Sequence, residues 1–127
     1  MPLDAGPAGQ QKSYLETIGR RTGGRHVIEI WFAADPERDR VYMLAGGRES
    51  SDWVLNMRAN PKVRVRIGGQ TFEGEAREIE GSPDEIRARH LVGAKYGYWR
   101  EGTELRGWAL DSLAVAIDLE IPGDSPT

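Results

Sequence analysis

Hydrophobic and polar residues alternate along much of the chain, which is the pattern of β-strands that bury one face. The alternation is clearest from His26 to Ala33, where one side of an extended chain carries Ile28, Ile30 and Phe32. Shorter segments of the same kind occupy 13–18 and 41–45. Turns rich in glycine, proline and aspartate separate these segments, so the first third of the chain is predicted to form a three-stranded meander.

The alternation returns in the second half of the chain, over residues 63–67, 70–80 and 113–119. Gly68 and Gly69 separate the first two of these segments, and a glycine pair at that spacing predicts a two-residue hairpin turn. Three further strands are therefore expected, which brings the predicted number to six.

Two segments between the predicted strands carry helix signals. The first begins at Ser51, a residue type favoured at helix N-caps, and ends near Asn60, because Pro61 disfavours helical geometry in the residue before it. The second begins with a capping-box sequence over 82–85 and is expected to run to about residue 95. Six strands and two helices in this order predict a mainly β fold, a small antiparallel barrel with flanking helices.

The length of 127 residues suits one domain, since a chain of this size buries roughly two-thirds of its unfolded surface. Residues 1–11 and 122–127 are rich in proline, glycine and small polar side chains, and we expect both segments to be flexible tails. A single domain over 12–121 is predicted between them.

Composition excludes several kinds of partner and site. A net charge of −3 is too close to neutral for a nucleic-acid-binding surface, which needs a broad excess of basic residues. The chain has no cysteine and two histidines, so no metal site is expected, and the lack of disulfides fits a reducing compartment. No apolar run of roughly 18 residues and no secretory leader are visible, so no membrane span is expected and the predicted location is cytoplasmic.

Charge is distributed unevenly along the chain. Residues 12–66 carry 11 basic and 7 acidic side chains, whereas residues 67–127 carry 6 basic and 12 acidic ones. The basic excess in the first half leaves room for a small, local site for an anion.

The densest group of cations lies in the glycine-rich turn after the first predicted strand. It contains Arg20, Arg21 and Arg25, with Thr22 and His26 beside them. Guanidinium groups, a hydroxyl and the backbone N–H groups of a bent loop together suit a phosphate or a carboxylate. A solvated hairpin tip, charged only for solubility, is the alternative that residue type leaves open.

A second candidate site follows the predicted strand over 41–45. Gly46 and Gly47 permit a ligand to approach the backbone, Arg48 adds a cation, and the following helix places Trp53 and Asn56 on one face. An asparagine on the same stripe as a tryptophan is unusual for a plain core face. The alternative is that Trp53 packs in the core while the asparagine cross-links loops.

A third candidate site lies where the second helix is expected to end. Tyr96, Tyr98 and Trp99 follow one another closely there. Their rings could wall an apolar substrate against a planar cofactor, and a phenol could orient or protonate that substrate. Aromatic residues that merely cover the mouth of a barrel would give the same pattern.

Three segments, taken in order, resemble the deazaflavin-dependent nitroreductases. They are Thr-Ile-Gly-Arg-Arg-Thr-Gly over 17–23, Ile-Trp-Phe over 30–32 and Trp-Val-Leu-Asn-Met-Arg-Ala-Asn-Pro-Lys-Val over 53–63. The resemblance spans roughly residues 14–80. These enzymes belong to a superfamily of flavin and deazaflavin oxidoreductases related to pyridoxamine-phosphate oxidase. The resemblance therefore implies a six-stranded antiparallel split β-barrel of the FMN-binding type, in a homodimer.

The resemblance also implies a cofactor and a reaction. Such proteins bind coenzyme F420, a deazaflavin with a phosphate and an oligoglutamate tail, and pass a hydride to a small, largely apolar acceptor such as a nitroaromatic, a quinone or an activated alkene. It assigns the phosphate to Arg20, Arg21 and Thr22. It assigns the cofactor groove to Gly46–Arg48, Trp53 and Asn56.

Several positions depart from the common pattern of these enzymes. His26 stands where many members have arginine, Glu29 where many have proline, and the loop over 46–52 looks shorter than usual. An FMN- or FAD-binding oxidoreductase of the same fold therefore stays open. So does a non-enzymatic protein that binds a flavin, a deazaflavin or a tetrapyrrole.

Overall fold

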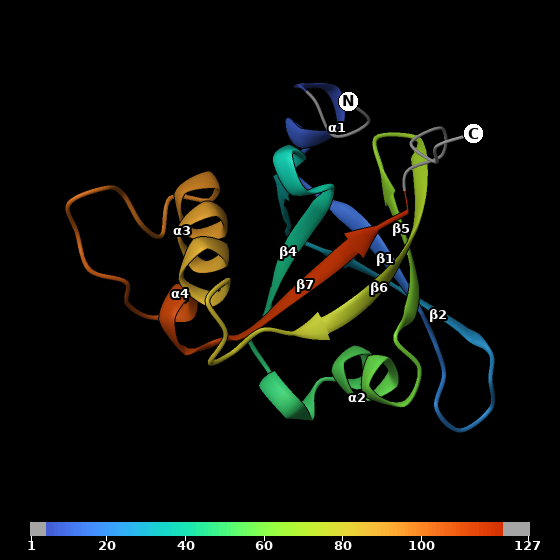
Figure 1. Cartoon of the computed structure of the whole chain (residues 1–127). Coiled ribbons are helices and arrows are strands. Elements are labelled where there is room, and N and C mark those ends of the chain that lie inside the picture. Colours follow the sequence, from blue (N-terminus) through green and yellow to red (C-terminus); the bar gives the residue numbers. More distant parts are fainter. Residues whose placement is uncertain (1–4, 121–127) are drawn as a thin grey trace.

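Seven antiparallel strands form one curled sheet in the computed structural model, which describes residues 5–120 (Figure 1). In chain order the strands are β1 (Ser13–Ile18), β2 (Arg25–Ile30), β3 (Ala33–Asp35), β4 (Arg40–Ala45), β5 (Lys62–Ile67), β6 (Gln70–Glu78) and β7 (Leu113–Leu119). Their order across the sheet is β2-β1-β5-β6-β7-β4-β3. The helices are α1 (Ala5–Ala8), α2 (Asp52–Ala59), α3 (Glu85–Lys95) and α4 (Trp108–Asp111), and the two short 3-10 turns are η1 (Pro36–Arg38) and η2 (Arg48–Ser50).

The mainly β fold is confirmed, but the number of strands is seven rather than six. The strand predicted over 26–33 breaks at Trp31 and Phe32 into β2 and β3, which lie at opposite edges of the sheet. At the break, the Phe32 N–H donates to the Tyr96 hydroxyl at 3.0 Å, and the Phe32 carbonyl oxygen lies 3.0 Å from the same hydroxyl. A side chain from another part of the chain therefore satisfies the Phe32 backbone in place of a strand partner.

The break also removes the predicted meander. β2 pairs with β1, from Thr17 opposite His26 to Ser13 opposite Ile30. β4 pairs instead with β3 and with β7, so the third predicted strand is not paired with β2. The hairpin between β5 and β6 is as predicted, and both of its glycines have positive φ, 56° at Gly68 and 87° at Gly69.

Two hydrophobic cores lie on the two faces of the sheet. The larger core fills the inside of the curl with β-strand side chains, and Trp53, Val54 and Met57 of α2 close one end of it. The smaller core lies between α3 and the outer face of β4 and β7, where Ala114 and Ala116 leave room for the helix. The last strand is buried on both faces for this reason, with α3 on its outer side (Figure 1).

The first predicted helix starts and ends as expected. Ser51 is the N-cap residue of α2, and Asn60, in an extended conformation, is its C-cap. The second helix starts at Glu85 rather than at the predicted capping box, because Ser82 is used in a turn. The Ser82 hydroxyl donates to the Ile79 carbonyl oxygen at 2.6 Å, while Glu85 accepts a hydrogen bond from the Gly81 N–H at 2.8 Å.

The described part of the predicted N-terminal tail contains α1, and its Gln11 carbonyl oxygen lies 2.7 Å from the Tyr96 hydroxyl. The predicted tail over 122–127 lies outside the described residues. Among residues 5–120, no helix is long and apolar enough to cross a membrane.

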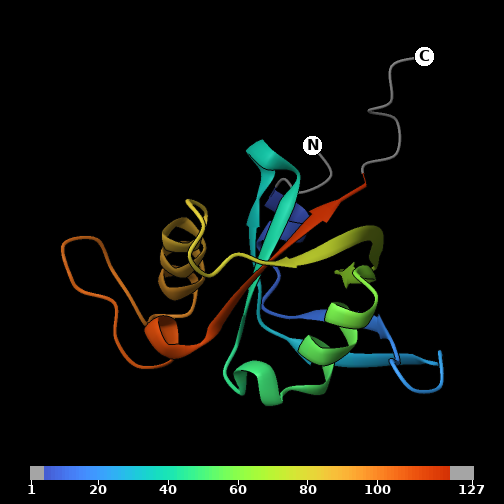
Figure 2. The same ribbon diagram turned by 60° about the horizontal axis from the view of Figure 1, so that its bottom comes forward.

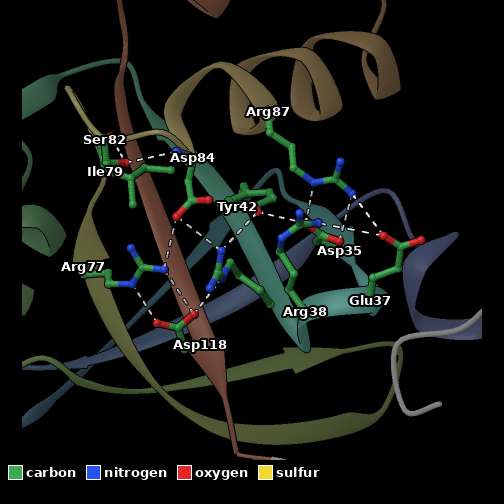
Figure 3. A network of polar contacts seen from close by, with 11 residues as sticks. Asp35, Glu37, Arg38, Tyr42, Arg77, Ile79, Ser82, Asp84, Arg87 and Asp118 are labelled. Carbon is green, nitrogen blue, oxygen red and sulfur yellow. Dashed lines mark hydrogen bonds and ion pairs between the residues drawn. The ribbon is translucent and has the colours of Figure 1, made fainter.

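A buried carboxylate attaches the start of α3 to the β3–β4 hairpin (Figure 3). Asp35 is 1% exposed and accepts hydrogen bonds from Arg87 Nε at 2.7 Å, from the Tyr42 hydroxyl at 2.9 Å and from Arg38 at 3.3 Å. Burial alone would raise the pKa of Asp35, but the hydrogen bonds from Arg87 and Tyr42 outweigh it and hold the pKa below its ordinary value of 3.8. A second carboxylate, Asp118, joins Arg40 and Arg77 beside this cluster.

Candidate functional site

A cavity of about 250 Å³ lies between the turn that joins β1 to β2 and the start of α2. Figure 2 shows this hairpin beside α2. The lining residues are Gly19, Arg20, Arg21, Thr22, His26, Asp52 and Asn56. We call this site the cationic cavity, because two arginines and a histidine face a single carboxylate.

Asn56 fixes the position of Arg20 in the cationic cavity. Its buried side-chain oxygen accepts hydrogen bonds from the Arg20 backbone N–H at 3.2 Å and from Arg20 Nη1 at 2.8 Å. The Asn56 amide nitrogen donates to the Thr17 hydroxyl at 3.2 Å. Arg20 Nη2 also lies 3.2 Å from the exposed carboxylate of Asp52. The Arg20 guanidinium is therefore held at the cavity wall by a group that is itself anchored to β1.

Arg21 and Thr22 are exposed at the mouth of the cavity. The Thr22 hydroxyl accepts a hydrogen bond from the Gly24 N–H at 3.2 Å, which leaves its own proton free for a ligand. Gly19 leaves room for His26 behind them, since a Cβ at that position would lie 2.5 Å from Nε2 of His26. These groups offer donors and positive charge to an anion of the size of a phosphate.

Four aromatic side chains gather at the opposite end of β2, and we call them the aromatic cluster. Trp31 stacks on Tyr96 with ring centroids 4.2 Å apart and an interplanar angle of 4°, and Trp108 meets Trp31 edge-on at 5.8 Å. Tyr98 lies 5.3 Å from Trp108. A cavity of about 430 Å³ beside the cluster is lined by Glu29, Ile30, Trp31, Tyr98 and Trp108. Its aromatic walls suit a planar, apolar ring.

The hydroxyl of Tyr96 is used within the fold. It accepts from the Phe32 N–H and lies within hydrogen-bonding distance of the carbonyl oxygens of Gln11 and Phe32. Burial raises the pKa of Tyr96, and the hydrogen bond from the Phe32 backbone offsets part of that rise. Tyr98 is 46% exposed and lines the aromatic cavity. Of the two predicted tyrosines, Tyr98 is the one placed to face a ligand.

The two cavities lie at the two ends of one strand. His26 lines the cationic cavity and Trp31 lines the aromatic cavity. At about 3.3 Å per residue along a strand, their Cα atoms lie roughly 16 Å apart. A ligand with a planar ring and an anionic tail could contact both ends of β2.

Some of the predicted site residues lie elsewhere. Arg25 pairs with Glu16 at 2.5 Å and does not line the cationic cavity. Arg48 donates to Glu80 at 2.7 Å and to the Asp111 carbonyl oxygen at 2.7 Å, which directs it toward the second half of the chain. The hydrogen bonds of Arg48, formed with residues distant in sequence, could not be foreseen from the local pattern.

The remaining predicted residues of the second candidate site serve packing. Trp53 is 8% exposed and belongs to the inner core. A Cβ at Gly47 would lie 2.7 Å from the Ser51 hydroxyl oxygen, so this glycine permits a tight turn. Gly46 alone borders the aromatic cluster, because a Cβ there would lie 3.2 Å from Cδ1 of Trp108.

Among the lining residues of the two cavities that the sequence did not indicate as site residues are Asp52, Trp31 and Trp108. Asp52 follows the predicted N-cap Ser51, where an acidic residue favours the helix start without any ligand, yet it lines the cationic cavity. Trp31 alternates with Ile30 and Phe32 and so falls on the opposite side of the predicted strand, where a large aromatic residue was a usable signal. Trp108 carried no such signal. No group of three or more metal-binding side chains is found within residues 5–120.

The amine of Lys95 has an unusual environment beside the aromatic cluster. Its Nζ is buried without a hydrogen-bond partner among the described residues, and it lies 3.6 Å from the centroid of the Phe32 ring and 5.3 Å from that of Tyr96. Burial lowers the pKa of Lys95 to about 8. The aromatic faces compensate only in part for the lost hydration of the charged form.

Replacement of Lys95 by methionine should raise the free energy of unfolding by about 1 kcal/mol near neutral pH, since methionine fills similar space without an unpaired ammonium group. The folded-state pKa of about 8 lies below the ordinary value of 10.5. Wild type therefore gains stability as pH rises from about 8 toward 10.5, and the advantage of the variant shrinks over that window. Urea unfolding at several pH values measures this, and an advantage that is constant with pH would contradict it.

The curled antiparallel sheet closed by a short helix places the protein in the split β-barrel class, and solved structures show the same fold. An F420 reductase structure superposes with a TM-score of 0.66 at 19% identity, covering 93% of this chain and 93% of that chain. The haem storage protein HutZ from Vibrio cholerae superposes with a TM-score of 0.67 at 16% identity, covering 88% of this chain and 83% of that chain. At these identities the likeness establishes the fold alone.

Residues 6–105 match the model of the F420H(2)-dependent quinone reductase family, and the chain belongs to that family. A curated F420H(2)-dependent quinone reductase of Mycobacterium tuberculosis is 26% identical over 88 residues. The match covers 68% of this chain and 59% of that relative, so the chain spans less than two-thirds of its length. The predicted relationship to the deazaflavin-dependent reductases is confirmed.

Proposed function

We propose that the protein is an oxidoreductase that uses reduced F420 to reduce a small, largely apolar acceptor. Membership of the quinone reductase family favours a quinone among the acceptor classes, and nitroaromatics and activated alkenes belong to the same proposal. The observation that carries it is the pair of cavities at the two ends of β2, one cationic and one aromatic. A deazaflavin with an anionic tail needs both kinds of environment.

The described residues fit such a cofactor. Arg21 and Thr22 present free donors at the cationic cavity, and Arg20 is pre-positioned by Asn56. His26 adds a further nitrogen to the wall. These five residues would hold the phosphate and the start of the acidic tail. Trp31 and the open backbone at Gly46 would border the ring. Arg25 and Arg48 pair with Glu16 and Glu80 and are left out of this proposed set of cofactor contacts.

When bound, reduced F420 supplies the hydride. The protein would hold the acceptor ring beside the cofactor ring at the aromatic cavity and keep water away from both, which is the larger part of catalysis for a hydride transfer between two planar groups. A quinone that gains a hydride must also gain a proton to become a hydroquinone. Tyr98 is placed to donate a hydrogen bond or that proton, because its ring lines the cavity.

The two tyrosines should respond differently to replacement by phenylalanine. Tyr98→Phe should slow single-turnover hydride transfer about tenfold, since the acceptor loses its donor. Tyr96→Phe should leave that rate near wild type and lower the free energy of unfolding by about 1–2 kcal/mol, because the Phe32 backbone loses its partner. Stopped-flow absorbance and urea unfolding measure the two effects. An unchanged rate in Tyr98→Phe removes the proposed donor.

A homodimer is also proposed. The outer face of the sheet at β1 and β2 exposes two large hydrophobic side chains, Tyr14 and Val27, which a second copy of the chain could cover. Sedimentation of the purified protein measures the oligomeric state, and a monomer at all concentrations would contradict this proposal.

The function is tested by titrating purified protein with F420, FMN, FAD and biliverdin and following fluorescence and absorption. Preferred binding of F420, followed by oxidation of the reduced complex on mixing with menadione, is the expected result. Tight binding of F420 without turnover of any quinone, nitroaromatic or activated alkene would instead identify a carrier. Preferred binding of FMN or FAD would identify a flavin oxidoreductase of the same fold.

A further inference from the structure

The loop between α3 and α4 forms a large cavity of its own. The cavity has a volume of about 650 Å³ and is lined by Ala94, Gly97, Tyr98, Trp99, Arg100, Thr103, Glu104 and Arg106. Figure 1 shows this loop extending away from the sheet beyond α3. Tyr98 also lines the aromatic cavity, so the two cavities meet at one side chain.

The start of the loop is firmly attached to α3. The N–H groups of Tyr98 and Trp99 both donate to the Gly93 carbonyl oxygen, at 2.8 and 3.1 Å. The Trp99 ring stacks on His90 with centroids 3.9 Å apart. A Cβ at Gly93 would lie 2.9 Å from Cβ of Trp99, so the glycine permits this close packing.

The turn that carries Arg100 is held by its own hydrogen bonds. The indole N–H of Trp99 donates to the Thr103 carbonyl oxygen at 2.9 Å, and the Thr103 hydroxyl donates to the Arg100 carbonyl oxygen at 2.6 Å. The Thr103 hydroxyl oxygen also lies 3.3 Å from the Arg100 backbone nitrogen. The backbone positions of Trp99, Arg100 and Thr103 are thereby fixed relative to Tyr98.

The two arginines of this loop differ from most others in the chain. Arg48, Arg58 and Arg64 each contact a carboxylate at 2.7 Å or less. Within residues 5–120, neither Arg100 nor Arg106 has a carboxylate within ion-pair distance, although both line the loop cavity. Glu104 is the acid in the lining, which leaves an excess of one positive charge beside the aromatic cluster.

We propose that the preferred acceptor is an aromatic or quinoid molecule that carries an anionic substituent. Its ring would lie in the aromatic cavity against Tyr98 and Trp108, and its carboxylate, sulfonate or phosphate would be held by Arg100 and Arg106. This inference rests on the proposed function and narrows the class of acceptor. A purely apolar acceptor would form no ion pair or charge-assisted hydrogen bond with the two guanidinium groups, whereas an anionic substituent would.

Binding without F420 tests the inference with two quinones that differ at one carbon, 1,4-naphthoquinone-2-sulfonate and menadione. Quenching of tryptophan fluorescence reports binding, since Trp31, Trp99 and Trp108 lie around the two cavities. Wild type should bind the sulfonate at least about tenfold more tightly than menadione, and added salt should reduce the difference.

The variant Arg100→Gln/Arg106→Gln should lose about tenfold in affinity for the sulfonate and change little toward menadione. Lys62→Gln/Arg64→Gln removes the same charge from β5, away from the loop, and should leave both affinities unchanged. Equal affinity of wild type for the two quinones, equal losses in the two double variants, or no binding of the sulfonate would each overturn the inference. If the sulfonate binds as expected but is not reduced by the F420-loaded protein, the proposed reaction is wrong while the anion-binding site stands.

Discussion

Replacement of Asp35 by alanine is expected to lower the free energy of unfolding by about 3 kcal/mol, a large part of the stability of a domain of this size. The reason is the number of groups that depend on one carboxylate. The buried hydroxyl of Tyr42 loses its acceptor, and Arg87 and Arg38 lose their buried counter-ion. Urea unfolding followed by circular dichroism measures the loss.

Glu37→Ala is the matched control for this prediction. Glu37 is a neighbouring acid that lies 3.9 Å from Arg38 and from Arg87, but its side chain is 82% exposed. A surface pair of this kind contributes less than about 1 kcal/mol, so the control should remain close to wild type. If both variants lose the same free energy of unfolding, the burial of Asp35 is not the cause of the loss.

The same carboxylate predicts a pH dependence. Since the folded-state pKa of Asp35 is held below its ordinary value of 3.8, its contribution to stability is present above that value and is lost as pH falls through the folded-state pKa. The difference in stability between wild type and Asp35→Ala should therefore narrow in acid. A difference that persists unchanged well below pH 3.8 would contradict this assignment.

The consequences of Asp35 extend to the aromatic cluster through α3. The contact between Arg87 and Asp35 fixes the start of this helix, and the Tyr96 hydroxyl fixes its end to Phe32 and Gln11. Tyr98 and the loop that follows are carried by the same helix. A weakened attachment at Asp35 should therefore also loosen the acceptor side of the site.

Local patterns predicted the elements of the fold better than their pairing. Alternation identified the strands and a glycine pair identified one hairpin, because both signals depend on neighbours in sequence. The break at Trp31 and Phe32 depends on Tyr96, a residue 64 positions away from Phe32. Nothing in the alternation over 26–33 could show that a distant hydroxyl would take the place of a strand partner.

The basic excess of the first half of the chain has mainly a structural explanation. Arg40 pairs with Asp118, Arg48 with Glu80 and Arg58 with Glu78, all acids of the second half. Arg64 pairs with Glu73 in the same way. Only part of the excess, at Arg20 and Arg21, lines the cationic cavity. Composition showed the asymmetry, but the assignment of each charge required the register of the sheet.

Candidate site residues were predicted correctly where they lie close together in a short sequence motif. They were missed where only the folded chain brings distant segments together. The turn over 19–24 is local, so Arg20, Arg21 and Thr22 fall into one cavity as expected. Asn56 joins them from another element, and the unusual asparagine on a helix face was a sufficient signal. The aromatic cluster brings together Trp31, which follows β2, the two tyrosines at the end of α3, and Trp108 of α4. Of these four residues, the sequence indicated only the two tyrosines as site residues.

Loss of the guanidinium groups at the cationic cavity should have the largest effect on cofactor binding. Arg20→Gln/Arg21→Gln is expected to weaken F420 binding about 100-fold, since charge-assisted hydrogen bonds to a phosphate contribute roughly 1.5–3 kcal/mol each. The remaining affinity should depend less on salt than that of wild type, because fewer ion pairs are left to screen. Fluorescence titration of F420 at low and high salt measures both effects.

Asn56→Ala separates positioning from charge at this cavity. It keeps both arginines but removes the acceptor that holds Arg20, and it leaves the Thr17 hydroxyl without its partner. We expect a smaller loss of F420 affinity, about tenfold, with the salt dependence of wild type retained. Lys62→Gln/Arg64→Gln, which removes two charges from β5, should bind F420 as wild type does. Equal affinities in wild type and Arg20→Gln/Arg21→Gln would remove the cationic cavity as the site of the phosphate, because guanidinium groups that contact a phosphate cannot be lost without a loss of affinity.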